Sequence, residues 1–293
     1  MTGQLASAST ISTDLTNNTN TTLVPGSSVD VVVAKGYSAA GDGGGGTFYW
    51  DNTLNVADGG TKIMPIGSTF GGWRRIFDGP LNVRWFGARG DKVTDDSPAF
   101  AKALSALGPV GSLVAGTVVV PKGDYRLTED LVLNREINLR GESGSGRSSA
   151  SKLIFADGRG ITVEMPGGQS SVIQDLYIRM NPADRPQAES PRPVRHGIHV
   201  QIVATIHRCC VIGFSGHGIH IDGSNSSGTP PVDYFVHQWR VSQCWIENNE
   251  GLGVLRSRRL YCRSGRQFEM HQQWARRDLG LVQGGEHVHR MHG

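Results

Sequence analysis

The sequence lacks several features that would assign it to common classes of protein. It has no run of 18 apolar residues and no basic start followed by an apolar stretch, so neither a membrane span nor a signal peptide is predicted. Its four cysteines include no C-x-x-C pair, and none has a histidine at metal-ligand spacing. Neither a zinc site nor a disulfide framework is therefore indicated.

Glycine is the residue in excess, at 40 of 293 residues, where about 7% is typical of soluble proteins. This content favours many turns over many helices, and the lack of a Gly-X-Y period excludes collagen. The net charge of +3 comes from the last 39 residues, which hold eight arginines, three acids and no lysine, whereas 21 basic and 23 acidic residues precede Leu255. A nucleic-acid-binding surface on the main part of the chain is therefore not expected.

Composition divides the chain into four segments. Residues 1–30 are rich in Ser, Thr and Asn without apolar periodicity, which predicts a flexible segment with no packed core. Residues 31–80 contain the short β-like runs VVVA and TFYW and predict a small β-rich head. Residues 81–254 are punctuated by turns and predict a stack of short strands, and residues 255–293 form an aberrant tail.

One amphipathic helix is predicted near the start of residues 81–254. Ser97 is a suitable N-cap, and Pro98 suits the first helical position. Phe100, Leu104 and Leu107 then fall on one face. Such a helix can cover the open end of a sheet.

An internal repeat predicts how the strands are arranged. Apolar residues recur at offsets 0, 3 and 5 in segments that start at Ile173, Ile206 and Val241. HGIHV at His196 is followed 21 residues later by HGIHI at His217, about one coil of a β-solenoid. Strands that cannot bury a face alone stack in such folds. The insertions NPADRPQAESPRP and SNSSGTPPVDY interrupt the repeat, and we expect them to build a binding face.

The run VRWFGARGDKVTDDSPAFAKAL resembles the opening signature of the pectate-lyase-like superfamily, which includes polygalacturonase-type enzymes, rhamnogalacturonase and epimerase-like domains and many phage tail spikes. The matching residues are Phe86, Gly87, Gly90, Asp91, Thr94, Asp95 and Asp96. The preceding GGGGTFYWD and GGWRR are similar to the head of phage-type members, so the resemblance covers residues 36–254. It implies an all-β fold, a right-handed parallel β-helix with an N-terminal capping helix and a small β-rich head.

The resemblance also implies a function. It is that of a tail-spike-like protein of a phage or prophage that binds polysaccharide, with degradation by a polysaccharide lyase or glycoside hydrolase activity left open. The alternatives are a non-catalytic structural or adhesive virion module and a bacterial pectin-type lyase or hydrolase. The expected partner is polysaccharide, with no nucleic acid and no membrane, and the tail-spike resemblance implies a homotrimer.

Without a signal peptide, such a protein is expected in the virion, or outside the cell after lysis. No cofactor is expected, except calcium if the protein is a lyase.

The catalytic candidates follow from the chemistry of glycan cleavage, which needs two carboxylates around the bond or, for elimination, a base. Gly216-His217-Gly218 resembles the Gly-His-Gly element of polygalacturonases, which makes His217 a candidate. His196 occupies the same place in the preceding repeat, and this repetition favours a coil-turn position instead. The acids that could line a groove near the end of the repeats are Asp222, Asp233 and Glu247.

The substrate-binding candidates are basic or aromatic. They are Arg185, Arg192, Arg195, Tyr234, Trp239 and Trp245. The arginines lie in or beside the first insertion, where a guanidinium group can bind uronate or sulfate through two hydrogen bonds. The aromatic residues form a candidate sugar-stacking platform, although strand alternation would bury one of the two tryptophans. Solvated loops are the alternative for the arginines.

Two further groups are predicted to be structural. Asp95 and Asp96 sit at the start of the predicted helix, where acids bind amides and favour the helix dipole. Cys209 and Cys244 share one repeat offset and should stack inward as reduced, small apolar side chains without a redox function.

The tail from Leu255 departs from the repeat, because lysine vanishes and Arg, His and Gln dominate. Suitable codons for Gln272 to His292, read one nucleotide later, permit SNGRGGTWDSSKVGNTYIGC, a sequence typical of further β-helix strands. We hypothesise that a frameshift near Val254 replaced the remaining coils. A DNA sequence with no better open frame downstream of Val254 would refute this hypothesis.

Overall fold

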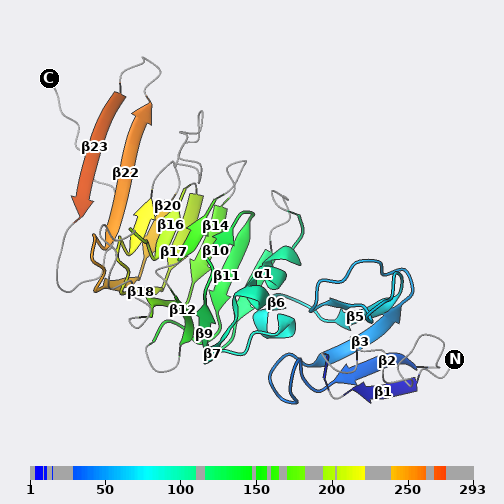
Figure 1. Cartoon of the computed structure of the whole chain (residues 1–293). Coiled ribbons are helices and arrows are strands. Elements are labelled where there is room, and N and C mark those ends of the chain that lie inside the picture. The colour runs from blue at the N-terminus through cyan, green and yellow to red at the C-terminus, as the bar shows by residue number, and fades with distance from the viewer. Residues whose placement is uncertain are drawn as a thin grey trace.

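A small sheet near the N-terminus is followed by a stack of short strands in the structure, a computed structural model (Figure 1). The structure describes residues 4–8, 10–11, 15, 29–109, 116–146, 150–156, 160–164, 170–181, 194–201, 203–221, 239–261 and 267–274. Only the backbone is described for residues 4–7, 29–30, 256–261 and 267–274.

The head is a five-stranded sheet in the order β1-β2-β3-β5-β4. Its strands are β1 (Gln4–Ala8), β2 (Val29–Ala34), β3 (Gly46–Asp51), β4 (Lys62–Ile63) and β5 (Gly72–Ile76). Phe48 and Trp73 are the largest buried side chains of its core. Arg75 is also buried and donates hydrogen bonds to the carbonyl oxygens of Gly44, Gly45 and Gly60 at 2.7, 2.6 and 3.1 Å.

The expectation that residues 1–30 contain no packed core is wrong at three positions. Ala8, Ile11 and Leu15 are buried in the core of the head. Ala8 is buried by strand pairing, because β1 lies parallel to β2 and brings Ala8 beside Ala34. Ile11 lies beyond β1, and its backbone N–H donates to the carbonyl oxygen of Gly36 at 3.0 Å. A Ser- and Thr-rich segment can supply isolated apolar side chains to a sheet edge without showing a period of its own.

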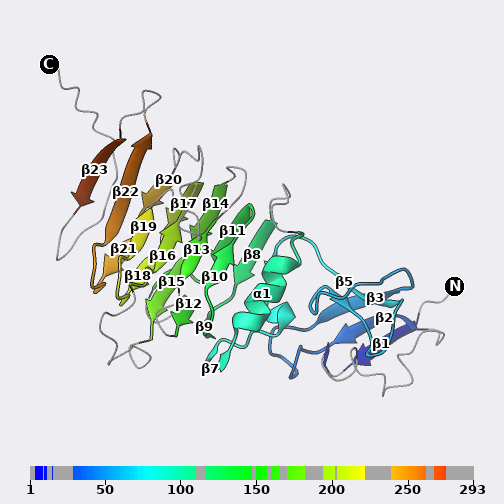
Figure 2. The same ribbon diagram turned by 45° about the horizontal axis from the view of Figure 1, so that its top comes forward.

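Three parallel sheets make up the β-helix, and Figure 2 shows their strands stacked along the molecule. The first sheet contains β6 (Leu81–Asn82), β8 (Gly116–Val120), β11 (Ile137–Gly141), β14 (Ser170–Gln174), β17 (Val203–His207) and β20 (Trp239–Ser242). The second sheet contains β7 (Asp91–Asp95), β9 (Gly123–Leu127), β12 (Ser151–Phe155), β15 (Leu176–Met180), β18 (Cys210–Ile212) and β21 (Trp245–Glu247).

The third sheet contains β10 (Leu131–Leu133), β13 (Ile161–Val163), β16 (Ile198–Val200), β19 (Ile219–Ile221), β22 (Val254–Tyr261) and β23 (Gln267–Trp274). From β8 on, each coil passes through the first, second and third sheets in turn, whereas α1 follows β7 in the first coil. The chain is thus an all-β, right-handed parallel β-helix with a β-rich head, as predicted.

The offset pattern 0, 3, 5 is explained by the corner between the first and second sheets. Ile173 points inward from β14, whereas Leu176 and Ile178 point inward from β15, and all three are fully buried. Asp175 between the two strands has φ 59°, and Arg208 and Gln243 repeat this left-handed conformation at φ 48° and 53°. One left-handed residue turns the chain through the corner, so that the next inward-facing residue comes one position later than simple alternation would place it.

Cys209 and Cys244 occupy the predicted inward row and are buried free thiols. Their Sγ atoms lie 3.5 and 3.7 Å from the carbonyl oxygens of Ile173 and Ile206, one coil earlier. Burial raises the pKa of the Cys209 thiol. The expected role as small apolar side chains is confirmed.

The short helix α1 (Ser97–Ser105) lies across the N-terminal end of the β-helix, after the 3₁₀ turn η3 (Val83–Phe86) (Figure 2). Phe100 and Leu104 are buried, as predicted, and Leu107 packs beside them. The helix begins at Ser97, so the N-cap position is Asp96 and not Ser97 as predicted, and Asp96 makes no side-chain capping bond. The Ser97 hydroxyl instead accepts a hydrogen bond from the Thr128 backbone N–H at 2.8 Å.

The end of the stack changes character at β22. Val254 to Arg256 continue the parallel register beside β19, but β22 then pairs antiparallel with β23. The segment boundaries and the frameshift hypothesis stay predictions. Among the described residues, no helix is long and apolar enough to cross a membrane.

Candidate functional site

The long insertions interrupt the coils on both sides of the third sheet. Residues 181–197 join β15 to β16, so they enter the third sheet, and residues 222–238 join β19 to β20, so they leave it. The outer surface of β16 and β19 therefore lies between the two longest connections of the stack. The structure describes only the ends of these connections.

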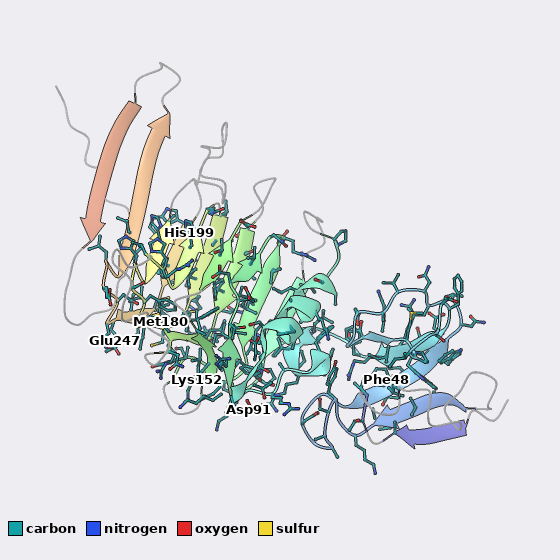
Figure 3. All side chains as sticks on the ribbon, in the orientation of Figure 1. Phe48, Asp91, Lys152, Met180, His199 and Glu247 are labelled. Carbon is teal, nitrogen blue, oxygen red and sulfur yellow. The ribbon has the colours of Figure 1, made fainter. Side chains whose placement is uncertain are left out.

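Four histidines gather on this surface because the H-G-I-H motif recurs in register. His199 and His220 occupy the outward position of β16 and β19, and their rings stack with centroids 5.1 Å apart and planes 7° apart. His196 and His217 stack in the preceding turns at 5.0 Å and 7°. The two stacks touch, since the His196 and His220 centroids are 4.3 Å apart. We call these four residues the histidine cluster; Figure 3 labels His199.

Glycine is required inside the motif by the close approach of coils. A Cβ atom on Gly197 would lie 2.7 Å from the carbonyl oxygen of Gly218 and 2.4 Å from a Val211 methyl group. Contacts this short are not tolerated, so a side chain here would separate the coils.

Hydrogen bonds fix the state of two of the imidazole rings. The backbone N–H of His217 donates to Nδ1 of His196 at 3.0 Å, and the backbone N–H of Leu252 donates to Nδ1 of His217 at 2.9 Å. An accepting Nδ1 places the proton of the neutral ring on Nε2. Burial lowers the pKa of His217, which also favours the neutral ring.

This arrangement does not suit His217 as a general base, because Nδ1 is already occupied and Nε2 carries the proton. It fits the coil-turn role indicated by the repeated motif. The catalytic assignment of His217 stays a prediction.

Arg195 directly precedes the histidine cluster and is half-buried. Its carbonyl oxygen accepts from the Gly216 N–H at 2.7 Å, and its N–H donates to the Ser215 hydroxyl at 3.3 Å. The Nε atom is buried and has no hydrogen-bond partner within the described part of the chain. Of the predicted arginines, Arg195 is therefore the one that the structure places next to this surface.

The other described candidates lie elsewhere. Trp239 faces inward beside Ala204 and packs against the core, whereas Trp245 is 49% exposed on the last strand of the second sheet. Glu247 follows on the same strand and is half-buried, on a different sheet from His199 (Figure 3). One of the two tryptophans thus faces the core, where it is partly buried, and the other is exposed. The candidates Asp222, Asp233, Arg185, Arg192 and Tyr234 lie outside the described residues.

Asp95 and Asp96 are engaged by the backbone around α1. The Asp96 carboxylate accepts from the N–H groups of Arg89 and Gly90 at 2.7 and 3.1 Å, and burial raises its pKa. The Asp95 carboxylate accepts hydrogen bonds from the Ser97 backbone N–H and from both the backbone N–H and the hydroxyl group of Thr128. These bonds tie the helix start to its neighbouring coil, so the structural reading of the pair is supported.

No group of three or more His, Cys, Asp or Glu side chains within the described ranges is arranged to hold a metal ion. The involvement of calcium stays a prediction that depends on lyase activity.

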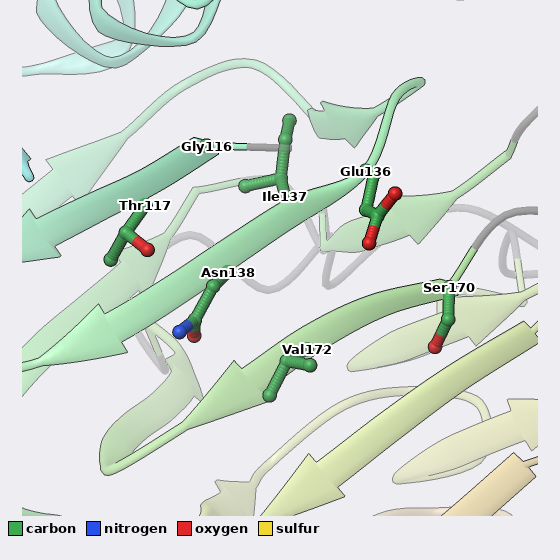
Figure 4. A pocket seen from close by; sticks show the side chains of 7 residues that line it. All are labelled: Gly116, Thr117, Glu136, Ile137, Asn138, Ser170 and Val172. Atoms are coloured by element: carbon green, nitrogen blue, oxygen red, sulfur yellow. The ribbon is translucent and has the colours of Figure 1, made fainter. Parts of the chain in front are cut away.

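A hollow of about 150 Å³ on the outer surface of the first sheet was not predicted from the sequence (Figure 4). It is lined by Gly116, Thr117, Glu136, Ile137, Asn138, Ser170 and Val172. Thr117, Asn138 and Val172 stand side by side on β8, β11 and β14. The usable signal was strand alternation, because Asn138 lies between inward-facing Ile137 and Leu139.

The comparisons with known proteins agree with this architecture. Residues 13–78 match the family described as "Phage tail protein small four-stranded beta-sheet domain". Residues 81–169 match the family described as "Rhamnogalacturonase A/epimerase, pectate lyase-like", which confirms the predicted resemblance. No curated protein sequence is significantly similar to the chain.

Solved tailspike structures share the fold at low sequence identity. The enzymatically active domain of tailspike protein 2 of bacteriophage CBA120 is 16% identical at a TM-score of 0.53, over 76% of this chain and 32% of that one. Full-length tailspike protein 2 from the Escherichia coli O157:H7 bacteriophage CAB120 is 18% identical at 0.53, over 76% and 29%. This chain thus spans about a third of the length of those proteins.

Proposed function

We propose that this chain, in which a phage tail β-sheet domain precedes a pectate-lyase-like β-helix, is a tailspike-like virion protein that binds bacterial polysaccharide. The order of these two matches is the observation that carries the proposal. A tail domain provides an attachment to the virion, and a solenoid provides an elongated surface suited to a polymer.

The third sheet is the surface we assign to polysaccharide. The two longest insertions flank it, and insertions on a solenoid commonly build its binding face. The histidine cluster offers ring faces and N–H groups to a sugar, and Arg195 adds a guanidinium group for an acidic one. Degradation, by a lyase or a glycoside hydrolase, is the enzymatic form of this proposal.

Adhesion without cleavage is the second candidate. It is favoured by His217, whose Nδ1 accepts from the Leu252 backbone N–H and is therefore not free to act as a base. A bacterial pectin-type lyase or hydrolase is the third, and it has no observation of its own beyond the pectate-lyase-like match.

A panel of bacterial capsular and pectic polysaccharides tests these functions. Retardation of the chain in gels containing one polysaccharide is expected, and new reducing ends or unsaturated uronate would identify hydrolysis or elimination. Loss of elimination on chelation, restored by Ca²⁺, would support the calcium expectation. If no polysaccharide retards the folded chain, the proposal is wrong. The molar mass in solution tests the homotrimer that we propose on the same likeness.

A further inference from the structure

We propose that the hollow over β8, β11 and β14 is a subsite for one uncharged sugar unit, held by hydroxyl groups that donate to Asn138 and Glu136 (Figure 4). This inference rests on the proposed function, because it assigns part of the bound polysaccharide. The hollow lies on the first sheet, whereas the histidine cluster lies on the third, and its proposed ligand is an uncharged sugar.

The Asn138 side chain carries an unsatisfied hydrogen-bond acceptor. The Asn138 Oδ1 atom is buried and has no hydrogen-bond partner among the described residues. A buried acceptor without a donor costs about 1–3 kcal/mol, so a ligand that supplies a donor recovers that free energy. The Asn138 side chain stands between Thr117 and Val172 on the outer surface of the first sheet, beside the hollow.

The side chains that line the hollow have the chemistry that a sugar ring needs. Thr117 and Ser170 contribute hydroxyl groups, Glu136 a carboxylate, and Val172 an apolar patch (Figure 4). Hydroxyl groups and amides beside an aliphatic side chain match a pyranose ring, which has hydroxyl groups at its edge and C–H groups on its face. Among the described residues, the lining contains no Lys, Arg or His side chain.

The negative charge of Glu136 in the lining disfavours an acidic sugar. A uronate carboxylate in this hollow would meet the Glu136 carboxylate with no cation in the lining to offset the repulsion. The hollow should therefore prefer an uncharged sugar, whereas Arg195 beside the histidine cluster suits an acidic one. A polysaccharide with alternating neutral and acidic units is compatible with both places.

The hollow is larger than the site of a single water molecule. Its volume of about 150 Å³ is well above the about 10–15 Å³ that one water molecule requires. Neighbouring units would lie outside it, along the polar outer residues of the first sheet.

The experiment measures binding of methyl β-glycosides to the full chain by saturation-transfer NMR. The probes are the methyl glycosides of glucose, galactose and mannose and those of glucuronic and galacturonic acid. We expect at least one neutral glycoside to bind more tightly than either uronide. The substitution Glu136→Gln should narrow that difference by strengthening uronide binding.

A matched pair of variants locates the site. Thr117→Val removes a hydroxyl group inside the hollow, and Thr205→Val removes one from the same outward row, three strands away on β17 and outside the hollow. Thr117→Val should weaken the neutral glycoside roughly fivefold, the effect of one neutral hydrogen bond, and Thr205→Val should not. Equal effects of both variants, tighter uronide binding, or no binding of any glycoside would overturn the inference.

The failure of this inference differs from the failure of the proposed function. If a polysaccharide retards the chain in a gel but no neutral glycoside occupies the hollow, only the subsite is refuted. If no polysaccharide retards the folded chain, the function is refuted as well.

Discussion

The head and the β-helix secure their backbones in different ways. In the head, one buried side chain, Arg75, binds three carbonyl oxygens from two separate loops. In the β-helix, each role is shared by a row of equivalent residues, such as Ile178, Val211 and Ile246 on successive coils. The head should therefore depend on single residues, and the β-helix on the completeness of its rows.

The largest effect is expected for Arg75→Ala. Burial lowers the pKa of Arg75 to about 10, so the group is still charged at neutral pH, and it also lies 4.6 Å from the centroid of Phe48. Its removal leaves three carbonyl oxygens without this donor and should destabilise the head by about 4 kcal/mol. Denaturant unfolding followed by tryptophan fluorescence measures this loss.

Arg74→Ala is the matched control. Arg74 pairs with Asp51 at the surface and is 35% exposed, so solvent screening makes the contribution of this pair to stability small. Similar losses for both variants would contradict the special role of Arg75.

The next effect compares two coils. Ile178→Ala removes a fully buried side chain with a coil on each side and should cost about 3 kcal/mol. Ile246→Ala removes a partly buried side chain of the same row on the last strand of the second sheet, and should cost less than half as much. Chemical denaturation measures both losses. Equal losses of unfolding free energy would show that the contribution of a row residue does not depend on the coils that cover it.

A smaller effect follows from pH. Because the folded-state pKa of His217 is lowered by burial, the unfolded chain binds more protons, and stability falls as the pH drops through about 6.5. His217→Asn can still accept from the Leu252 N–H but cannot be protonated. Thermal unfolding between about pH 7.5 and 5 should show that the variant loses less stability than the wild type as the pH falls. A pH profile that matches the wild type would remove His217 from the account.

The smallest effect is expected at the corner. Gln243 has φ 53°, which costs a residue with a Cβ atom about 1–2 kcal/mol, and glycine avoids this cost while losing about 0.5–1 kcal/mol of chain entropy. Gln243→Gly should thus stabilise the last coil by less than about 1 kcal/mol. A destabilised variant would mean that the side chain contributes more than its strained backbone costs.

The same contrast explains what the sequence could predict. The offsets of Ile173, Leu176 and Ile178 predicted an inward row because every coil repeats the same corner. Burial of Ala8 was not predictable, since it depends on a parallel strand pairing that leaves no period in a polar segment, and the isolated apolar residues Ile11 and Leu15 show no period either.

The site was only partly predictable for a related reason. The H-G-I-H repeat identified His196 and His217, but their Nδ1 hydrogen bonds require the actual stacking of coils. The hollow brings together Thr117, Asn138 and Val172 from coils of unequal length. Without the register, these residues are unrelated positions in the chain.

Amide hydrogen exchange of the chain with and without a retarding polysaccharide tests the central claim most directly. The account predicts slower exchange in β16 and β19 and their turns, and in β8 and β11 beside the hollow, with no change in β3 and β5 of the head. Protection confined to the head strands, or none despite binding, would contradict the assignment of the β-helix surface to polysaccharide.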